Sequence, residues 1–411
     1  MKSVREATDL MLPAFVPIGT ERLALAAAHG RFLAEEISAR FDLPPFDNSS
    51  MDGYAVRADE TAGATESSPT TLMMVGESRT GGPIPEPLAP GTIMRIFTGA
   101  VMPVGADAIV IQENTSANGT AIAIRDSAKV GAWVRRRGND LAQGSTMLAR
   151  GSRIGAGEIG ILAAQGVSAV TVFRKPRVAI VSTGDELRDI HDVREPGSII
   201  NSNAYALAAQ VREAGCDPVV LPNVPDDMSA TLEALGAGLT CDVLLTIGGV
   251  SVGDYDFVKD AFATLGIEAG FWKVAIKPGK PLIFGKCAQT PVVGLPGNPM
   301  SAMVTFEALV RPGLRAMLGD PKPHRARHDV MLAVDHRHAS GRLELARARL
   351  AFAEGKALAT PLRLQDSGSL PSWVDVDALL LLAEDRTTYA AGEVVPALFI
   401  RDETGCAVSP F

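Results

Sequence analysis

The sequence lacks the features by which secreted, membrane and nucleic-acid-binding proteins are recognised. Its N-terminus contains no apolar region of the kind found in signal peptides, and no segment approaches the ~18 consecutive apolar residues of a transmembrane helix. The formal net charge of −8, with no long basic block, argues against a nucleic acid held mainly by electrostatic attraction. We therefore expect a cytoplasmic protein that has neither a membrane nor a nucleic acid as its partner.

Cysteine and histidine are also scarce, which limits the metal sites that the chain can build. The four cysteines stand far apart and form no CxxC pair, so neither a disulfide framework nor a zinc knuckle is indicated. We interpret them as small buried or half-buried residues; they are Cys216, Cys241, Cys287 and Cys406. The six histidines lack partners at the usual spacing of metal ligands, and we expect the pair His336 and His338 to lie on a solvated strand.

The 411 residues are too many for one ordinary hydrophobic core and suggest roughly two to four domains. Between residues 177 and 321, short apolar runs alternate with segments of helical periodicity. The predicted strands are 178–181, 219–221, 243–247, 282–284 and 292–295, and the predicted helices are 202–214, 230–239, 257–265 and 300–317. Such alternation indicates an α/β domain whose mainly parallel sheet is covered on both faces, and Pro312 should kink or split the last helix.

Three further regions surround this α/β domain. Residues 47–140 contain short apolar runs separated by glycine, proline and Asn118-Gly119, which predicts an inserted small β domain. The flanking residues 1–46 and 141–176 should form a discontinuous N-terminal helical domain, with helical patterns after a capping box at 3–6, around 21–39 and at 150–166. Residues 322–411 predict a C-terminal β domain. The expected fold class is therefore multidomain α/β plus β.

Three of the predicted parallel strands lead directly into loops that contain glycine. These loops are 181–186, 247–254 and 295–299. Because the carboxyl ends of parallel strands meet at one edge of a sheet, and helix N-termini there carry partial positive charge, such loops can hold a phosphate group. Each loop alone could be a tight turn that binds nothing, but the three together favour a phosphate-bearing ligand.

Lysines and acids add to this edge. Lys277 and Lys280 lie on a short segment stiffened by prolines, which lowers the entropy cost of presenting them to a phosphate or a similar oxyanion, although lysines of a solvated turn are the alternative. Glu186, Asp226 and Asp256 follow strands or precede helices, where acids often act only as caps, and Asp227 is an alternative to Asp226. Gathered at one edge, these carboxylates would repel each other unless a divalent cation such as Mg²⁺ neutralised them.

Six segments form a specific combination of motifs that spans most of the chain. They are Pro44 to Val56, Arg95 to Asp107, Ser182 to Leu187, Thr246 to Gly253, Lys277 to Pro281 and Leu295 to Pro299. In this order the motifs resemble the molybdopterin molybdenumtransferases of the bacterial MoeA type, and they are similar also to the E domain of gephyrin. The resemblance is weaker after residue 320.

The resemblance implies an elongated homodimer with four domains in each subunit, in which residues 177–321 form the molybdenum-cofactor-biosynthesis α/β module. It further implies the insertion of molybdenum from molybdate into adenylylated molybdopterin, with release of AMP and with the help of Mg²⁺ or another divalent cation. The preceding adenylyltransferase and the molybdoenzymes that receive the product would be further partners.

The resemblance also assigns roles to individual residues. Asp52 and Thr98 would be catalytic residues that complete the cleft of the partner subunit. Glu186 and Asp256 would be catalytic and, with Asp226, would bind the metal. The implied substrate-binding residues are Asp140, Gly248, Gly249, Ser251, Lys277, Lys280, Pro296, Gly297, Asn298, Pro299, Arg347 and Ser367. The sequence departs from the family pattern at Asn139, where a glutamate is expected, and at Pro371.

Two other functions remain open at this point. The first is a molybdopterin adenylyltransferase of the same pathway, but residues 1–176 exceed what a stand-alone α/β module needs. The second is a non-catalytic, gephyrin-like dimeric scaffold, against which the complete sets of acids, lysines and glycine loops argue.

Overall fold

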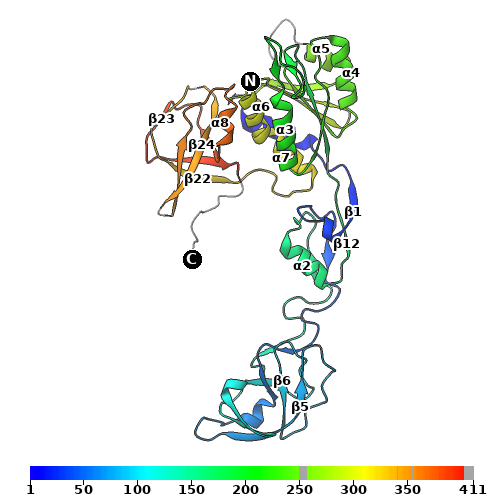
Figure 1. Ribbon diagram of the computed structural model, residues 1–411, viewed down its shortest axis with the longest axis vertical. Helices are drawn as coiled ribbons and strands as arrows, with labels where there is room; N and C mark the ends of the chain where they lie inside the picture. Colours follow the sequence, from blue (N-terminus) through cyan, green and yellow to red (C-terminus); the bar gives the residue numbers. More distant parts are fainter. Residues whose placement is uncertain (250–256, 340, 354, 402–411) are drawn as a thin grey trace. The chain divides into compact units, whose positions relative to one another are not determined.

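The structure, a computed structural model, describes residues 1–249, 257–339, 341–353 and 355–401 (Figure 1). The chain folds into two compact units, each built from separate stretches of sequence. The first unit contains Met1–Ala34, Gly151–Ala156 and the residues from Ala169 onwards, and the second contains Glu35–Arg150 and Gly157–Ser168. Within the described residues, no helix is long and apolar enough to cross a membrane.

The α/β part of the first unit is built on a six-stranded sheet with the order β16-β13-β17-β21-β20-β18. The strands are β13 (Arg177–Ser182), β16 (Asp217–Val220), β17 (Val243–Ile247), β18 (Glu268–Lys273), β20 (Pro281–Cys287) and β21 (Thr290–Leu295). All five predicted strands are present, and four of them run parallel. Strand β18 was not predicted because it has only one buried residue, Phe271, and therefore lacks an apolar run.

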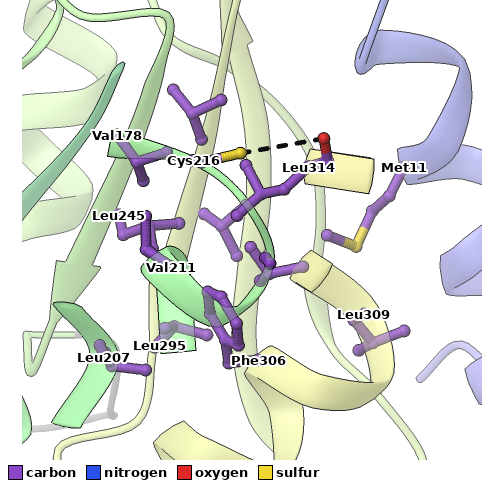
Figure 2. Packing of buried hydrophobic residues seen from close by; sticks show 14 of the residues in the cluster. Met11, Val178, Leu207, Val211, Cys216, Leu245, Leu295, Phe306, Leu309 and Leu314 are labelled. Carbon is purple, nitrogen blue, oxygen red and sulfur yellow. Dashed lines mark hydrogen bonds between the residues drawn. The ribbon is translucent and has the colours of Figure 1, made fainter. Parts of the chain in front are cut away.

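Helices cover both faces of this sheet, as predicted. They are α3 (Ser202–Glu213), α4 (Met228–Gly238), α5 (Phe257–Thr264), α6 (Pro299–Thr305) and α7 (Arg311–Met317). On one face Leu245 belongs to the same buried cluster as Val211 of α3 and Phe306 (Figure 2). On the other face Leu244 packs in a second cluster with Phe262 of α5. Successive side chains of a strand point to opposite faces, so neighbouring residues of β17 serve the two clusters.

The last predicted helix is divided, as expected. A π-helical turn (Phe306–Val310) joins α6 to α7, and Pro312 lies in the first turn of α7. Proline has no N–H to donate to the preceding turn, so the regular hydrogen bonding of the helix is interrupted there.

The described cysteines are packing residues. Cys216 and Cys241 are buried and Cys287 is half-buried, as predicted, whereas Cys406 lies outside the described residues. Burial raises the pKa of Cys216 to about 12, so its thiol stays protonated and unreactive at neutral pH.

The N-terminal region differs from the prediction. Helix α1 (Val4–Met11) begins with the predicted capping box, in which Ser3 Oγ accepts from the Glu6 N–H and the Glu6 carboxylate accepts from the Ser3 N–H. The predicted helix at 21–39 is wrong, because β1 (Thr20–Ala24) pairs with β12 (Ala169–Phe173) and only a 3₁₀ turn (Leu25–Ala27) follows. Pairing with a strand far away in sequence satisfies the backbone and overrides the helix preference of leucine and alanine.

A closed β-barrel forms the C-terminal region, where a β domain was predicted. Its strands are β22 (Arg327–Leu332), β24 (Leu343–Ala353), β25 (Lys356–Pro361), β26 (Ala378–Leu382) and β28 (Val394–Phe399). The barrel closes because β24 pairs with β25 on one side and with β26 on the other. Strand β19 (Ile276–Lys277), which comes from the α/β part of the chain, adds to β24 in parallel.

The expectation of a solvated histidine pair is wrong. His336 begins the two-residue strand β23 (His336–Arg337), which pairs with β27 (Thr388–Tyr389), and it is half-buried. The side chain of His338 is fully buried. The alternating polar pattern of this segment resembles an exposed strand, but β23 pairs with β27, a strand about 50 residues later in the chain, and the local sequence does not encode this pairing.

The second unit contains a six-stranded sheet with the order β7-β4-β6-β5-β9-β8. The strands are β4 (Gly53–Val56), β5 (Thr70–Ser78), β6 (Thr92–Ile96), β7 (Ala108–Ile111), β8 (Thr115–Asn118) and β9 (Ala121–Ile124). Gly119, with φ +61°, forms the predicted turn between β8 and β9. The β character of this region is confirmed.

The segments that flank this sheet pair with one another. Strand β3 (Asn48–Ser49) pairs with β10 (Val134–Arg135), and β2 (Ile37–Ser38) pairs with β11 (Thr146–Leu148). Helix α2 (Ala156–Ala164) occupies the later part of the helical stretch predicted from 150 to 166. Strands therefore replace much of the predicted N-terminal helical domain, and the boundaries of the four predicted domains stay a prediction.

Truncation of a buried side chain should destabilise the first unit. Phe306 is fully buried, and Phe306→Ala should lower the free energy of unfolding by about 3–5 kcal/mol through lost burial and a remaining cavity. Phe352→Ala, at an exposed position of β24, is the matched control and should change it by about 0.5 kcal/mol or less. Urea unfolding followed by circular dichroism measures both, and equal losses would contradict the packing described.

Candidate functional site

The three glycine loops meet at the carboxyl edge of the parallel strands. Strands β13, β17 and β21 are direct neighbours, so their carboxyl ends lie side by side. The Thr183 N–H donates to Ile247 O at 3.1 Å, and the Gly248 N–H donates to Leu295 O at 3.2 Å. Backbone hydrogen bonds therefore tie each loop to the next strand, and the predicted meeting of the loops is confirmed.

Gly248 and Gly249 lie where no side chain fits. Both have a positive φ, +84° and +62°. A Cβ atom on Gly248 would lie 2.9 Å from Thr183 O, and one on Gly249 would lie 2.2 Å from Cγ2 of Val258 in α5. Glycine at both positions thus lets the start of the loop pack closely against Thr183 and α5. The predicted site residues Ser251 and Asp256 lie outside the described residues.

The loop from Pro296 to Pro299 is fixed by two side chains from other elements. Asn203 of α3 donates from Nδ2 to Gly297 O at 2.6 Å, and Asn298 donates from Nδ2 to Ser367 Oγ at 3.1 Å. The Met300 N–H also donates to Ser367 O at 2.9 Å. Ser367, predicted from the C-terminal region, is therefore joined to this loop, whereas Asn203 was missed. The sequence did offer one signal for Asn203, namely its position in the first turn of a helix that starts at the edge of the sheet.

The two lysines lie at the same edge for a topological reason. Strand β20 is antiparallel to β21, with Ile283 opposite Gly294, so the residues before β20 meet the carboxyl end of β21. Lys280 directly precedes β20 and is exposed. A Cβ atom on Gly279 would lie 2.2 Å from Cγ2 of Thr305, which shows how closely the lysine loop packs against α6. The Lys277 ammonium lies 3.2 Å from the carboxylate of Glu344 in the barrel.

A group of carboxylates occupies the ends of β13 and β16. The Asp226 N–H donates to Asp185 Oδ1 at 3.0 Å. Burial raises the pKa of Asp226, and the nearby charges of Asp185 and Glu186 raise it further. Asp227 instead accepts from the Ala230 N–H as the N-cap of α4, so Asp226 is the acid that faces the others. Repulsion among like charges of this kind is relieved by a bound cation.

The carboxylate of Glu186 lies over Gly184. A Cβ atom on Gly184 would be 2.6 Å and 2.7 Å from the two carboxylate oxygens of Glu186. Glycine at this position therefore makes room for the acid. Among the described residues, no group of three or more histidines, cysteines or acids is placed to hold a metal ion. The predicted magnesium set of Glu186, Asp226 and Asp256 includes one residue outside them, so it stays a prediction.

Arg347 supports the loop that carries Ser367. It is fully buried, and its Nη2 donates to Leu364 O and Asp366 O at 3.0 and 3.1 Å. Its Nε and Nη1 atoms are buried without a hydrogen-bond partner among the described residues. Burial lowers the pKa of the guanidinium. The predicted binding of substrate by Arg347 is untested, and its visible contacts are to the loop.

In the second unit, Asp52 and Thr98 lie together as predicted. Asp52 Oδ1 accepts from the Thr98 N–H at 2.7 Å and from the Thr98 hydroxyl at 2.8 Å. The Thr98 N–H, followed by the hydroxyl, lowers the pKa of Asp52, because both stabilise the charged carboxylate. Arg95 contributes in the same direction, and its guanidinium lies over the rings of Tyr54 and Phe97.

Asp140 lies in another part of the second unit's surface. Its carboxylate is 3.5 Å from Arg135 Nη2 and 3.3 Å from Asn139 Nδ2. Its backbone N–H donates to Leu43 O at 2.9 Å. The amide of Asn139 thus adds a donor to Asp140 where a glutamate would have added negative charge.

Comparison with known proteins agrees with this geometry. The chain matches the MoeA N-terminal region (domain I and II) over residues 2–166, a probable molybdopterin binding domain over 179–316 and the MoeA C-terminal region (domain IV) over 329–400. A molybdopterin molybdenumtransferase of Bacillus subtilis (strain 168) is 37% identical over 391 residues, which cover 94% of this chain and 91% of the relative. The chain belongs to the molybdopterin molybdenumtransferase family.

Other members of the molybdopterin molybdenumtransferase family agree over the same length. A relative from Mycobacterium tuberculosis (strain ATCC 25618 / H37Rv), named molybdopterin molybdenumtransferase 2, is 38% identical and covers 95% of this chain and 98% of its own. The crystal structure of the molybdopterin biosynthesis moeA protein from Pyrococcus horikoshii OT3 superposes with a TM-score of 0.84 at 30% identity, covering 97% of this chain and 100% of that one.

Removal of the Thr98 hydroxyl should raise the pKa of Asp52 part of the way to its usual value, because the Thr98 N–H remains as a donor. Carboxyl-carbon NMR titration of Asp52 in Thr98→Val measures the change. Thr92→Val is the control, since the hydroxyl of Thr92 donates to Ala89 O and not to Asp52. An Asp52 titration identical in wild type and Thr98→Val would contradict the described pairing.

Proposed function

We propose that this protein inserts molybdenum from molybdate into adenylylated molybdopterin and releases AMP, with Mg²⁺ or another divalent cation. One observation carries the proposal: three glycine loops, an acidic group and two lysines share one edge of the sheet. A ligand that bears both phosphates and a separate oxyanion needs this combination. The membership in the family of transferases named for molybdenum supports the choice of oxyanion.

The glycine loops are proposed to bind the phosphates. The Gly248 N–H already donates to Leu295 O, so Gly248 is proposed to let the backbone approach the phosphates through its lack of a side chain, and Gly249 is proposed to donate its N–H. Pro296, Gly297, Asn298 and Pro299 form the neighbouring wall, in which Gly297 and Asn298 are exposed. Lys280, exposed at the same edge, adds positive charge for the phosphate oxygens.

The acidic group is proposed to hold the divalent cation. Glu186 and Asp226 offer oxygen ligands, and burial together with the nearby charges of Asp185 and Glu186 raises the pKa of Asp226, which a bound cation would counteract. A cation held there would stabilise the charge that develops on the phosphoryl oxygens as AMP leaves. Because a proton on Asp226 competes with the cation, metal affinity should fall as the pH drops through the raised pKa.

Molybdate is proposed to bind between the lysine loop and Ser367. Lys277 supplies an ammonium group, and Ser367 is held at the Asn298 end of the glycine loops by two hydrogen bonds. Arg347 of β24 fixes the loop around Ser367 through its hydrogen bonds to Leu364 O and Asp366 O. An oxyanion bound there is proposed to lie next to the phosphate ligand, as a transfer reaction requires.

The second unit is proposed to act across a homodimer. The lowered pKa of Asp52 keeps a charged carboxylate next to the hydroxyl of Thr98 at neutral pH. We propose that Asp52 and Thr98 complete the cleft of the partner subunit, with Asp140 as a substrate contact. We also propose a cytoplasmic location, and delivery from an adenylyltransferase to recipient molybdoenzymes.

The proposed reaction is tested by mixing the protein with adenylylated molybdopterin, Mg²⁺ and molybdate and following AMP. AMP should form only when molybdate is present, and Asp226→Asn should slow it about 100-fold, because one charged group at the phosphoryl site is lost. Glu233→Gln, an exposed acid of α4, is the matched control and should keep wild-type turnover. AMP formation that ignores molybdate would point to another reaction, and no AMP at all would favour a scaffold.

Gly184→Ala should also reduce turnover, by about 10- to 100-fold, because the new methyl group displaces the Glu186 carboxylate by an ångström or more. Gly19→Ala is the matched control, since Gly19 also has a positive φ, +134°, and a Cβ atom there meets no atom within 4 Å. Thermal unfolding of both variants checks that the fold is kept. Full activity of folded Gly184→Ala would show that the position of Glu186 does not matter for turnover.

A further inference from the structure

Glu344, a buried acid of the barrel, lies next to the Lys277 ammonium. The Glu344 side chain is only 3% exposed, and both of its oxygens lie 3.2 Å from the Lys277 ammonium. On its other side Glu344 Oε2 lies 3.0 Å from Nδ1 of His338, whose side chain is fully buried. One carboxylate therefore faces two groups that can each carry a positive charge.

Strand pairing holds this arrangement in place. Lys277 of β19 lies opposite Glu344 of β24, and the Leu343 N–H donates to Ala275 O at 3.1 Å. Arg342 Nη1 also lies 3.4 Å from Ile276 O. The backbone of the lysine loop is thus fixed to the barrel, whereas the side chain of Lys277 is 31% exposed and its ammonium can change partner.

The contact between His338 and Glu344 is incomplete as it stands. Nδ1 is at ion-pair distance from Oε2, but it makes no aligned hydrogen bond, and Nε2 has no partner among the described residues either. A neutral imidazole gains little from such a contact. A protonated ring would form a charge-assisted pair with the buried carboxylate.

The Lys277 ammonium cannot pair fully with Glu344 and with a bound oxyanion at the same time. If its ammonium turns to a bound oxyanion, Glu344 is left as a buried carboxylate with weaker compensation, which is costly. A proton added to Nδ1 of His338 removes this cost, because the imidazolium then replaces the ammonium as the partner of Glu344. The proton comes from water, and the pair of sites gains one positive charge.

We propose that the Glu344 carboxylate pairs with the Lys277 ammonium until the oxyanion binds. His338 then takes up one proton and replaces Lys277 as the partner of Glu344. Glu344 and His338 are positioning residues that act through Lys277. This inference rests on the proposed function, because it takes molybdate as the oxyanion at Lys277. It explains why a substrate lysine of the α/β part is built into the sheet of the barrel.

The other charged groups around the pair do not take this role. Burial lowers the pKa of His336, so this ring is neutral at neutral pH although Glu344 acts in the opposite direction. Arg347 also faces Glu344 electrostatically, but its Nη2 is committed to two carbonyl groups. On β27 the Tyr389 ring lies 5.8 Å from the His338 ring, measured between ring centroids. The Arg386 guanidinium lies over the Tyr389 ring.

The test is calorimetric titration of the intact protein with sodium molybdate in two buffers of different ionisation enthalpy, at about pH 6 and about pH 8, on either side of the usual range of a histidine. The wild type should take up about one proton per molybdate at the higher pH, and its affinity should fall by up to about tenfold per pH unit as the pH rises. Both effects should vanish in Glu344→Gln, which keeps the side-chain shape, and in His338→Gln.

The two variants are expected to differ in affinity. At about pH 6, Glu344→Gln should bind molybdate at least as tightly as the wild type, because no carboxylate competes for Lys277, whereas His338→Gln should bind about tenfold more weakly. His328→Gln is the matched control, because His328 stacks on Phe399 in the barrel, and it should keep the wild-type proton uptake. The variants are made separately, so failure of one to fold leaves the other as the test.

The controls separate this inference from the proposed function. If the wild type does not bind molybdate, or if Lys277→Met binds it equally well, the proposed oxyanion site is wrong. If the wild type binds, Lys277→Met does not, and Glu344→Gln and His338→Gln keep the wild-type proton uptake, the inference is overturned and the proposed function stands.

Discussion

The parallel pairing of β13, β17 and β21 is the constraint on which the candidate site depends. It brings three strand ends within hydrogen-bonding distance of one another, so that the loops after them are linked through Thr183, Gly248 and Leu295. The crowding that results leaves no room for side chains at Gly248 and Gly249. The two glycines at the start of this loop are therefore a consequence of the close packing at the edge of the sheet.

The order of the strands also separates acidic from basic residues along this edge of the sheet. The acids Glu186 and Asp226 follow β13 and β16 at one end of the order, and Lys280 precedes β20 at the other, with the glycine loops between them. One end of this edge is therefore acidic and the other end is basic. The reversal of β20, which is antiparallel to its neighbour, is what brings the lysines to the same side as the acids.

Sequence reasoning succeeded where the signal was local and failed where it depended on distant partners. Five of the six strands of the α/β sheet, and the glycine loops, were predicted because apolar runs and glycines mark them in the sequence. The stretch from 21 to 39 has the composition of a helix and was wrongly predicted, because β1 finds its partner in β12, about 150 residues later. Glu344, Asn203 and the burial of His338 were missed because each depends on contacts between elements far apart in the chain.

Strand β19 links the order of synthesis to the assembly of the site. The segment Ile276–Lys277 enters a sheet by pairing with β24, which begins at Leu343. A ribosome must therefore add more than sixty residues beyond the lysine before that lysine can reach its folded environment. The α/β part cut off before the barrel would keep its glycine loops but would lose the support of its lysine loop. In this family member the α/β part and the β-barrel are thus joined through a shared strand pairing, and exchanging one without the other would disturb the lysine loop first.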